Sequence, residues 1–124
     1  MNKRISYEEK RRSPRIEKNI PLKIKDGDFD FITETKNISS IGAYCVTDRY
    51  IAPLTKIKIT LLLPEGKKND YQYLNLKGVV VRIEKQNNDL ENKYNIAVFF
   101  NDINQTNKDK LNSYIQQHLQ EINP

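Results

Sequence analysis

The sequence predicts a mainly β fold: a six-stranded antiparallel barrel with one C-terminal α-helix and a flexible N-terminal arm. Six segments of alternating apolar and polar residues, or of β-branched and aromatic residues, are separated by Gly, Pro, Asn and Asp. A stripe of apolar residues at helical spacing follows the last segment. Many short antiparallel strands with turn signals between them favour a closed or nearly closed barrel. At 124 residues, the chain forms one domain with a modest core.

The first three expected strands follow from alternation and turn residues. Residues 20–25 alternate apolar and charged side chains, which is typical of a half-buried strand. Gly27 then permits a tight turn. Residues 29–38 return along the first strand and are rich in β-branched and aromatic residues. Residues 42–47 alternate again and form the third strand.

The last three expected strands are longer. Residues 56–63 carry the clearest alternation in the sequence, with isoleucine and leucine on one face. Residues 71–85 form a long β run that we expect to bend at a bulge near Gly78. In this run we expect Val79, Val81 and Ile83 to face the core. Residues 93–100 form the sixth strand, with alternate apolar residues inward.

A single helix is expected to follow and to cover an end or a face of the barrel. Thr106 and Asp109 have the spacing of a capping box, with Asp in the usual Glu position. The apolar stripe consists of Leu111, Tyr114, Ile115, His118, Leu119 and Ile122.

Charge divides the chain into an arm of residues 1–18 and a single barrel domain of residues 19–124. The arm has seven basic and three acidic residues, so its net charge is 7 − 3 = +4. The whole chain carries +5, which leaves 5 − 4 = +1 for the barrel. A broad nucleic-acid surface needs positive charge across a folded face. The distribution instead predicts a local anion site near the N-terminus and no bound nucleic-acid polymer.

Cysteine usage and hydropathy favour a cytoplasmic protein. Cys45 is the single cysteine, so no internal disulfide can form. No apolar run approaches the roughly 18 residues that a membrane span requires. The first residues also lack the apolar segment of a secretory signal.

Reactive side chains are too few to predict catalysis. With one His and one Cys, the chain cannot supply the ligands of a structural zinc site, and Cys45 and His118 are expected on different elements. The four glycines are scattered, so no phosphate-binding loop is present. We therefore expect no enzyme activity, no metal and no cofactor.

Two short stretches point to a ligand. Arg11 and Arg15 have the spacing Arg-x-x-x-Arg, and Arg12 lies between them. The stretch Asn37–Gly42 reads Asn-Ile-Ser-Ser-Ile-Gly and falls where two expected strands meet. Either stretch alone is common in a solvated arm or a turn. Together they occur in order, separated by a hairpin, in a small barrel that ends in a helix.

This combination resembles the PilZ domain, a bacterial receptor module for cyclic di-GMP. The resemblance runs from about Glu9 to Leu119 and implies a PilZ-type β-barrel. Residues 78–83 and 96–100 resemble two later strand patterns of the family. The family often has Gly where Ala97 stands, and often has Asp where this chain has Asn37.

The resemblance implies that cyclic di-GMP is the ligand and that the arm folds over it. Arginine can grip guanine or phosphate with two parallel hydrogen bonds. The Asn37 amide can accept from a guanine N–H, Ser39 can bond near the guanine edge, and Gly42 can admit the ligand or adopt positive φ. A protein without an output domain would signal through a partner protein. The implied ligand-binding residues are Arg11, Arg12, Arg15, Asn37, Ser39 and Gly42.

Two alternatives stay open at this point. A PilZ-like fold without a ligand would act as a protein-interaction adaptor. An OB-like barrel could bind single-stranded nucleic acid, with Tyr71 and Tyr73 as stacking platforms.

Overall fold

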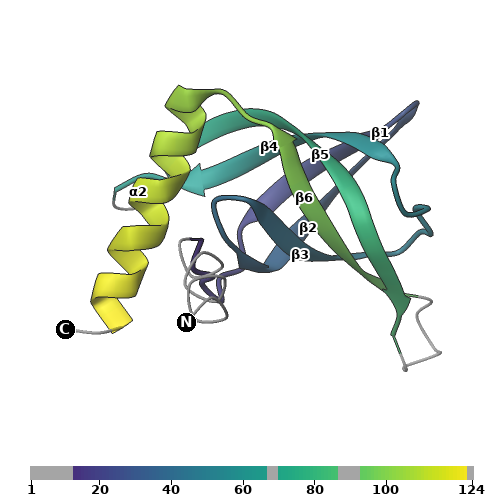
Figure 1. Ribbon diagram of the computed structural model, residues 1–124, viewed down its shortest axis with the longest axis horizontal. Helices are drawn as coiled ribbons and strands as arrows, with labels where there is room; N and C mark the ends of the chain where they lie inside the picture. The colour runs from purple at the N-terminus through teal and green to yellow at the C-terminus, as the bar shows by residue number, and fades with distance from the viewer. Residues whose placement is uncertain (1–12, 67–69, 87–92, 123–124) are drawn as a thin grey trace, which may run out of the picture.

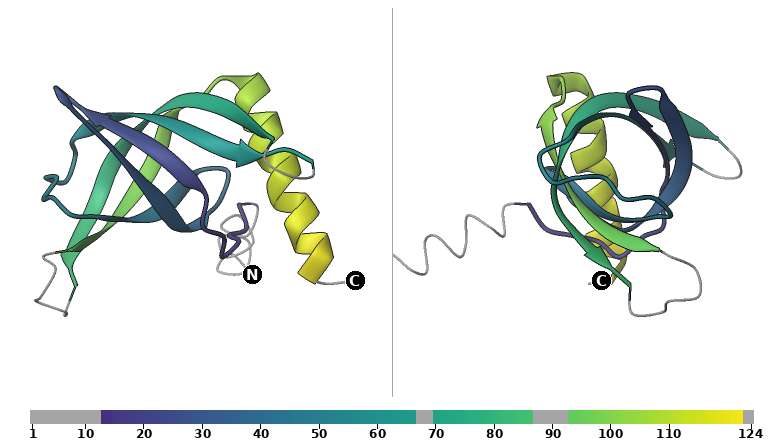
Figure 2. Two further views of the ribbon diagram at one scale, coloured as in Figure 1. Left: turned by 180° about the vertical axis from the view of Figure 1, so that it is seen from behind. Right: turned by 90° about the vertical axis from the view of Figure 1, so that its right-hand side faces the viewer.

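The computed structural model describes residues 13–66, 70–86 and 93–122. In this part of the chain, six antiparallel strands close into a barrel in the order β1-β2-β3-β6-β5-β4, which confirms the predicted fold class. Figure 1 shows the barrel with the helix at one end, and the right-hand view of Figure 2 looks into the ring of strands. The elements are β1 (Pro21–Asp26), β2 (Phe29–Ile38), β3 (Gly42–Thr47), β4 (Lys56–Pro64), β5 (Tyr71–Lys85), β6 (Tyr94–Asp102) and α2 (Gln105–Ile122).

The barrel core forms because apolar residues alternate inward along neighbouring strands. Ile24 of β1 lies opposite Ile59 of β4, which in turn lies opposite Leu76 of β5. All three are buried. On each strand, the residues immediately before and after them point to the outer, solvent side of the barrel. Burial of each such side chain stabilises the fold by about 1.5–3 kcal/mol before entropy is counted.

Two strands contain irregularities that change which face a residue occupies. In β2 the register shifts between Thr35 and Asn37. Thr35 and Ile38 are both fully buried, and the two residues between them point outward. A β-bulge produces this pattern because it places two residues of one strand opposite one residue of its partner.

The prediction for Val81 is wrong, because β5 contains two irregularities. The register shifts between Lys77 and Val79, near the expected bulge, and again between Val80 and Arg82. Val80 is fully buried, whereas Val81 is 50% exposed. Three consecutive valines do not reveal the phase of a strand, so only the bulges determine which of them faces the core.

Helix α2 lies across one end of the barrel (Figures 1 and 2), as expected. Leu111 and Ile115 are buried in the barrel core. The predicted cap is wrong: the helix begins at Gln105, and the Asn104 side chain accepts a hydrogen bond of 2.8 Å from the backbone N–H of Asn107. That geometry makes Asn104 the N-cap. No helix in the described part of the chain is long and apolar enough to cross a membrane.

Part of the predicted arm packs against the barrel. Ile16 is buried and exchanges two backbone hydrogen bonds of 3.0 Å with Ile38 of β2. The Thr35 hydroxyl accepts from the backbone N–H of Ile20 at 2.9 Å and donates to the carbonyl of Lys18 at 2.6 Å. The apolar side chain of Ile16 therefore belongs to the core, and the boundary after Lys18 stays a prediction.

Candidate functional site

Two of the predicted ligand-binding residues contact each other. Arg15 lies one residue before the buried Ile16, and its Nη1 donates a hydrogen bond of 3.2 Å to Oδ1 of Asn37. Arg15 is exposed and Asn37 is half-buried, so both side chains are open to a ligand from solvent. The structure thus brings one residue of each motif, Arg15 and Asn37, to one place on the barrel surface.

The β2 bulge and the Ile16–Ile38 bridge create this contact. The bulge turns Asn37 outward while the next residue, Ile38, points into the core. The bridge holds the chain before β1 beside the end of β2. Arg15 is adjacent to one bridge residue and Asn37 to the other, so their side chains meet on the outer surface. Figure 1 shows the start of the coloured chain lying near the turn between β2 and β3.

Ser39 and Ser40 form the turn after β2 and are both buried. The Ser39 hydroxyl accepts from the backbone N–H of Ile41 at 3.2 Å and lies 3.4 Å from the carbonyl oxygen of Gly42. Ser40 Oγ lies 3.5 Å from Ser13 Oγ, which adds a contact between this turn and the N-terminal segment. In this conformation Ser39 shapes the turn, and its contact with guanine stays a prediction.

Gly42 is needed for packing against β6. A Cβ at this position would overlap the backbone carbonyl oxygen of Val98. The φ angle of Gly42 is not positive, in contrast to those of Gly27 and Gly66. Gly42 does not use the positive φ that a glycine permits, and close approach of two strands explains the glycine. Arg11 and Arg12, which complete the predicted site, lie outside the described residues.

An outward-facing row of residues extends the site across three further strands. Asn37 lies opposite Tyr44 of β3, Tyr44 opposite Ala97 of β6, and Ala97 opposite Arg82 of β5. The Tyr44 hydroxyl donates to Glu84 Oε1 at 3.2 Å. Desolvation raises the pKa of Tyr44, and the hydrogen bond to Glu84 raises it further, so the phenol stays protonated at neutral pH.

Sequence reasoning did not single out Tyr44 or Arg82, because the row depends on strand register. Alternation alone indicates that a residue faces outward, and it does not say which residues lie side by side. Ala97 lies between Tyr44 and Arg82 in this row. Because its side chain is only a methyl group, it projects less from the barrel surface than its two neighbours.

Cys45 does not have the properties of a nucleophile. It is fully buried, and burial raises the pKa of its thiol to about 12. A reactive cysteine instead needs a lowered pKa and some exposure. His118 packs edge-on against Tyr114 on α2, with 4.2 Å between ring centroids. Among the described residues, no group of three or more His, Cys, Asp and Glu could hold a metal ion.

A comparison with protein-family models decides the family. The model of the PilZ domain matches residues 9–117 and therefore covers most of the chain. The chain belongs to the PilZ domain family. Both motif stretches, the six strands and most of α2 fall inside the matched range.

Solved structures show the same PilZ fold. The chain resembles the inhibitor of motility MotI/DgrA from Bacillus subtilis, with a TM-score of 0.74, 19% identity and coverage of 87% of this chain and 51% of that one. It also resembles MrkH from K. pneumonia in complex with c-di-GMP, with a TM-score of 0.70, 15% identity and coverage of 90% and 53%. The PilZ domain of YcgR from Escherichia coli with c-di-GMP gives a TM-score of 0.65 at 13% identity, and the match covers 89% and 91%.

At these identities the likeness is one of fold. The chain spans about half the length of MotI/DgrA and MrkH, but nearly the whole PilZ domain of YcgR. A comparison with curated protein sequences finds no match.

The packing role of Gly42 in this PilZ domain can be tested with paired substitutions. Gly42→Ala should lower the free energy of unfolding by about 1–3 kcal/mol, because the new methyl meets rigid backbone. Gly78→Ala should cost less, because its Cβ would come closest to two side-chain atoms, Val98 Cγ1 at 2.7 Å and Ile59 Cδ1 at 2.9 Å, and would lie 3.1 Å from the nearest backbone atom, the carbonyl oxygen of Phe99. Urea denaturation of both variants measures the difference. An equal or larger loss for Gly78→Ala contradicts the prediction.

Proposed function

We propose that this PilZ domain is a receptor for cyclic di-GMP. The observation that carries the proposal is the contact between Arg15 and Asn37, which come from the two motifs and share one exposed patch. The c-di-GMP complexes of MrkH and of the YcgR PilZ domain, which have the same fold, support the choice of ligand. The proposal assigns the protein a binding role and no chemical reaction.

The ligand offers groups that these side chains can recognise. Cyclic di-GMP carries two phosphates and two guanines. A guanidinium can bind guanine O6 and N7 in parallel, pair with phosphate, or stack on a purine. Arg15 and Arg11 are proposed for these contacts, with Arg12 beside them. Asn37 is proposed to accept from a guanine N–H, and Arg82 and Tyr44 lie where the row across the barrel could contact the rest of the nucleotide.

The proposed switch is a closing of the N-terminal segment over the nucleotide. The bridge between Ile16 and Ile38 fixes the base of this segment. The ligand then draws Arg11 and Arg12 toward Arg15 and Asn37, which changes the surface that a partner protein meets. Four specific side-chain contacts supply roughly 6–12 kcal/mol gross, and ordering a segment offsets about 2–5 kcal/mol of it. Backbone contacts add to the remainder, so affinity near the micromolar range is expected.

Calorimetric titration with cyclic di-GMP tests the ligand. The intact domain should bind at micromolar or lower concentration, and Arg11→Ala/Arg15→Ala should weaken binding by at least about 100-fold, since two charge-assisted contacts are lost. Arg49→Ala is the control, because Arg49 stacks on Phe29 with 3.8 Å between its Cζ and the ring centroid, away from the two motifs. Lack of binding by the intact domain overturns the receptor proposal and favours the ligand-independent adaptor.

The Asn37→Asp variant tests the role of the amide. A carboxylate can accept from two guanine N–H groups and carries charge, so the variant should bind cyclic di-GMP about tenfold more tightly. The gain should disappear when Asn37→Asp is combined with Arg11→Ala/Arg15→Ala. Calorimetry of the three proteins provides the measurement, and unchanged affinity in Asn37→Asp means that this side chain does not face a guanine edge.

Amide hydrogen exchange tests the closing step. Adding cyclic di-GMP should protect backbone amides in residues 8–15, because the ligand would hold this segment against the turn after β2. Amides in β4, which pairs with β1 and β5 and contains neither motif, serve as the internal control and should exchange at the same rate with and without ligand. Binding without new protection in residues 8–15 contradicts the closing step and leaves the ligand assignment intact.

A further inference from the structure

Five lysines gather on the outer face of three adjacent strands. Lys25 of β1 lies directly opposite Lys58 of β4, and Lys58 directly opposite Lys77 of β5. Lys23 and Lys56 lie two residues away on β1 and β4 and point to the same side. All five are exposed. We call these five residues the lysine face.

The lysine face revises the charge distribution expected from the sequence. Residues 19–124 have a net charge of only +1, and yet five of their fourteen basic residues lie together on one side of the barrel. Strand alternation explains how this happens: lysines at every second position share a face, and strand register then aligns the rows. The positive charge is therefore not confined to the N-terminal stretch.

This arrangement has an energetic cost in the isolated domain. Like charges directly opposite each other on neighbouring strands destabilise a sheet. Lys23 is relieved by Asp30 at 3.3 Å and Lys77 by Asp102 at 4.0 Å, and both ion pairs are exposed. Among the described residues, no ion pair neutralises Lys25, Lys56 or Lys58. An anionic partner would remove the repulsion in the middle of the row.

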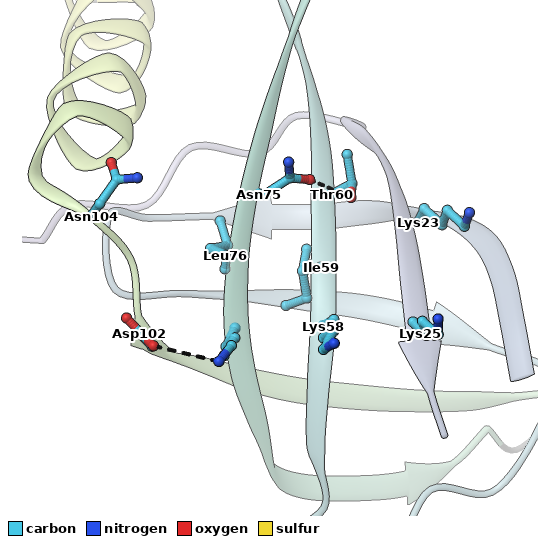
Figure 3. A pocket seen from close by; sticks show the side chains of 10 residues that line it. Lys23, Lys25, Lys58, Ile59, Thr60, Asn75, Leu76, Asp102 and Asn104 are labelled. Carbon is cyan, nitrogen blue, oxygen red and sulfur yellow. Dashed lines mark hydrogen bonds and ion pairs between the residues drawn. The ribbon is translucent and has the colours of Figure 1, made fainter. Parts of the chain in front are cut away.

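Two hollows lie over the lysine face. The larger has a volume of about 440 Å³. Figure 3 shows Lys58 between Lys25 on one side and Asp102 on the other, with Asn104 rising beside the helix. Thr60 and Asn75 belong to its lining, and the Thr60 hydroxyl donates a hydrogen bond of 2.8 Å to Asn75 Oδ1. A second hollow of about 370 Å³ includes Lys25, Lys56, Lys58 and Lys77. The lysine face is therefore not flat, and its hollows have room for side chains of a bound partner.

Exposed apolar residues border the lysine face. Ile32 of β2 lies opposite Lys23 and is 77% exposed, and Tyr73 of β5 is 68% exposed. Tyr73 lies opposite Leu62 of β4, which is partly exposed. Apolar and aromatic anchors contribute much of the affinity of protein interfaces, and these exposed side chains provide such anchors beside the charged row.

We propose that the lysine face docks an acidic segment of a partner protein, whose carboxylates enter the hollows while apolar residues contact Ile32 and Tyr73. This inference deepens the proposed function, because it locates the surface for the partner through which the receptor signals. The face itself lies on β1, β4 and β5, whereas the Arg15–Asn37 contact lies beside the β2–β3 turn.

The limits of the positive row favour a protein over other polyanions. Asp30 and Asp102 close the row at its two ends, on β2 and β6. A nucleic-acid duplex that makes six to ten phosphate contacts needs a longer positive track. An anionic membrane would press both aspartates against its headgroups. A short acidic peptide can place its carboxylates on the three central lysines and avoid both aspartates.

Titration of the full chain with an acidic peptide tests the proposal. The probe is a fluorescein-labelled 12-residue peptide of four Asp-Glu-Leu repeats, followed by fluorescence anisotropy without nucleotide. Lys25→Glu/Lys58→Glu should weaken binding at least tenfold. The matched control, Lys85→Glu/Lys110→Glu, makes the same charge change at exposed lysines outside the face and should change affinity less than twofold. Amide shifts of the intact chain should concentrate on β1, β4 and β5.

The outcomes separate this inference from the nucleotide proposal. Equal loss in both variants, or amide shifts confined to the N-terminal basic residues, overturns the lysine face as a docking surface. Tighter binding of a 20-base-pair duplex or of phosphatidylserine vesicles, lost in Lys25→Glu/Lys58→Glu, also overturns it in favour of another polyanion. The affinity of Lys25→Glu/Lys58→Glu for cyclic di-GMP, measured by calorimetry, should equal that of the intact chain. Nucleotide binding and peptide binding are therefore tested independently of each other.

Discussion

The bulge in β2 between Thr35 and Asn37 is the constraint on which the candidate site depends. In regular alternation from the inward-facing Thr35, Asn37 would also point into the core and Ile38 would face solvent. The extra residue reverses both positions, so that Asn37 is half-buried on the outer side and Ile38 is fully buried. One local irregularity therefore supplies both an outward-facing amide and an apolar anchor for the N-terminal segment.

The anchored segment gives Arg15 a defined base. Ile16 pairs with Ile38 through two backbone hydrogen bonds, and four residues later the Thr35 hydroxyl fixes the chain at Ile20. Between these points the chain can move little relative to β2. The backbone of Arg15 is already held in place. Binding a ligand would therefore cost Arg15 less conformational entropy than it would cost an arginine on an unanchored chain. The hydrogen bond to Asn37 also orients the guanidinium on the barrel surface.

Much of this fold could be predicted from the sequence because alternation and turn residues act locally. The bounds of β2, β3 and β5 follow from such signals, as does the inward face of β6. Val81, Ile16 and Asn104 could not be assigned in this way. The face of Val81 depends on a bulge that three valines do not encode, and Ile16 is buried by a long-range bridge. Asn104 and Thr106 are both competent caps, and only the path of the chain out of β6 decides between them.

The candidate site shows the same division between local and long-range information. The motif residues could be named from their spacing, but the contact of Arg15 with Asn37 requires the bridge between Ile16 and Ile38. The reasons for Gly42 could not be foreseen either, because the carbonyl of Val98 comes from a strand more than 50 residues away in sequence. Residue identity indicates what a position can bind, whereas register decides what stands next to it.

Strand β1 connects the two proposed surfaces. Its N-terminal extension carries Arg15 to the patch beside β2, and its own outward residues, Lys23 and Lys25, belong to the lysine face. The hydrogen bonds of Thr35 lie between them, at the point where the segment enters the strand. A ligand that pulls on the segment before Ile16 acts on the same continuous backbone that presents these lysines. Because coupling requires differential contacts in two states, the shared strand matters only if the closed segment and the partner both touch it. In the proposed arrangement the nucleotide engages the extension of β1 and the acidic partner its outer face, so coupling between them would require two states of β1 that both ligands distinguish.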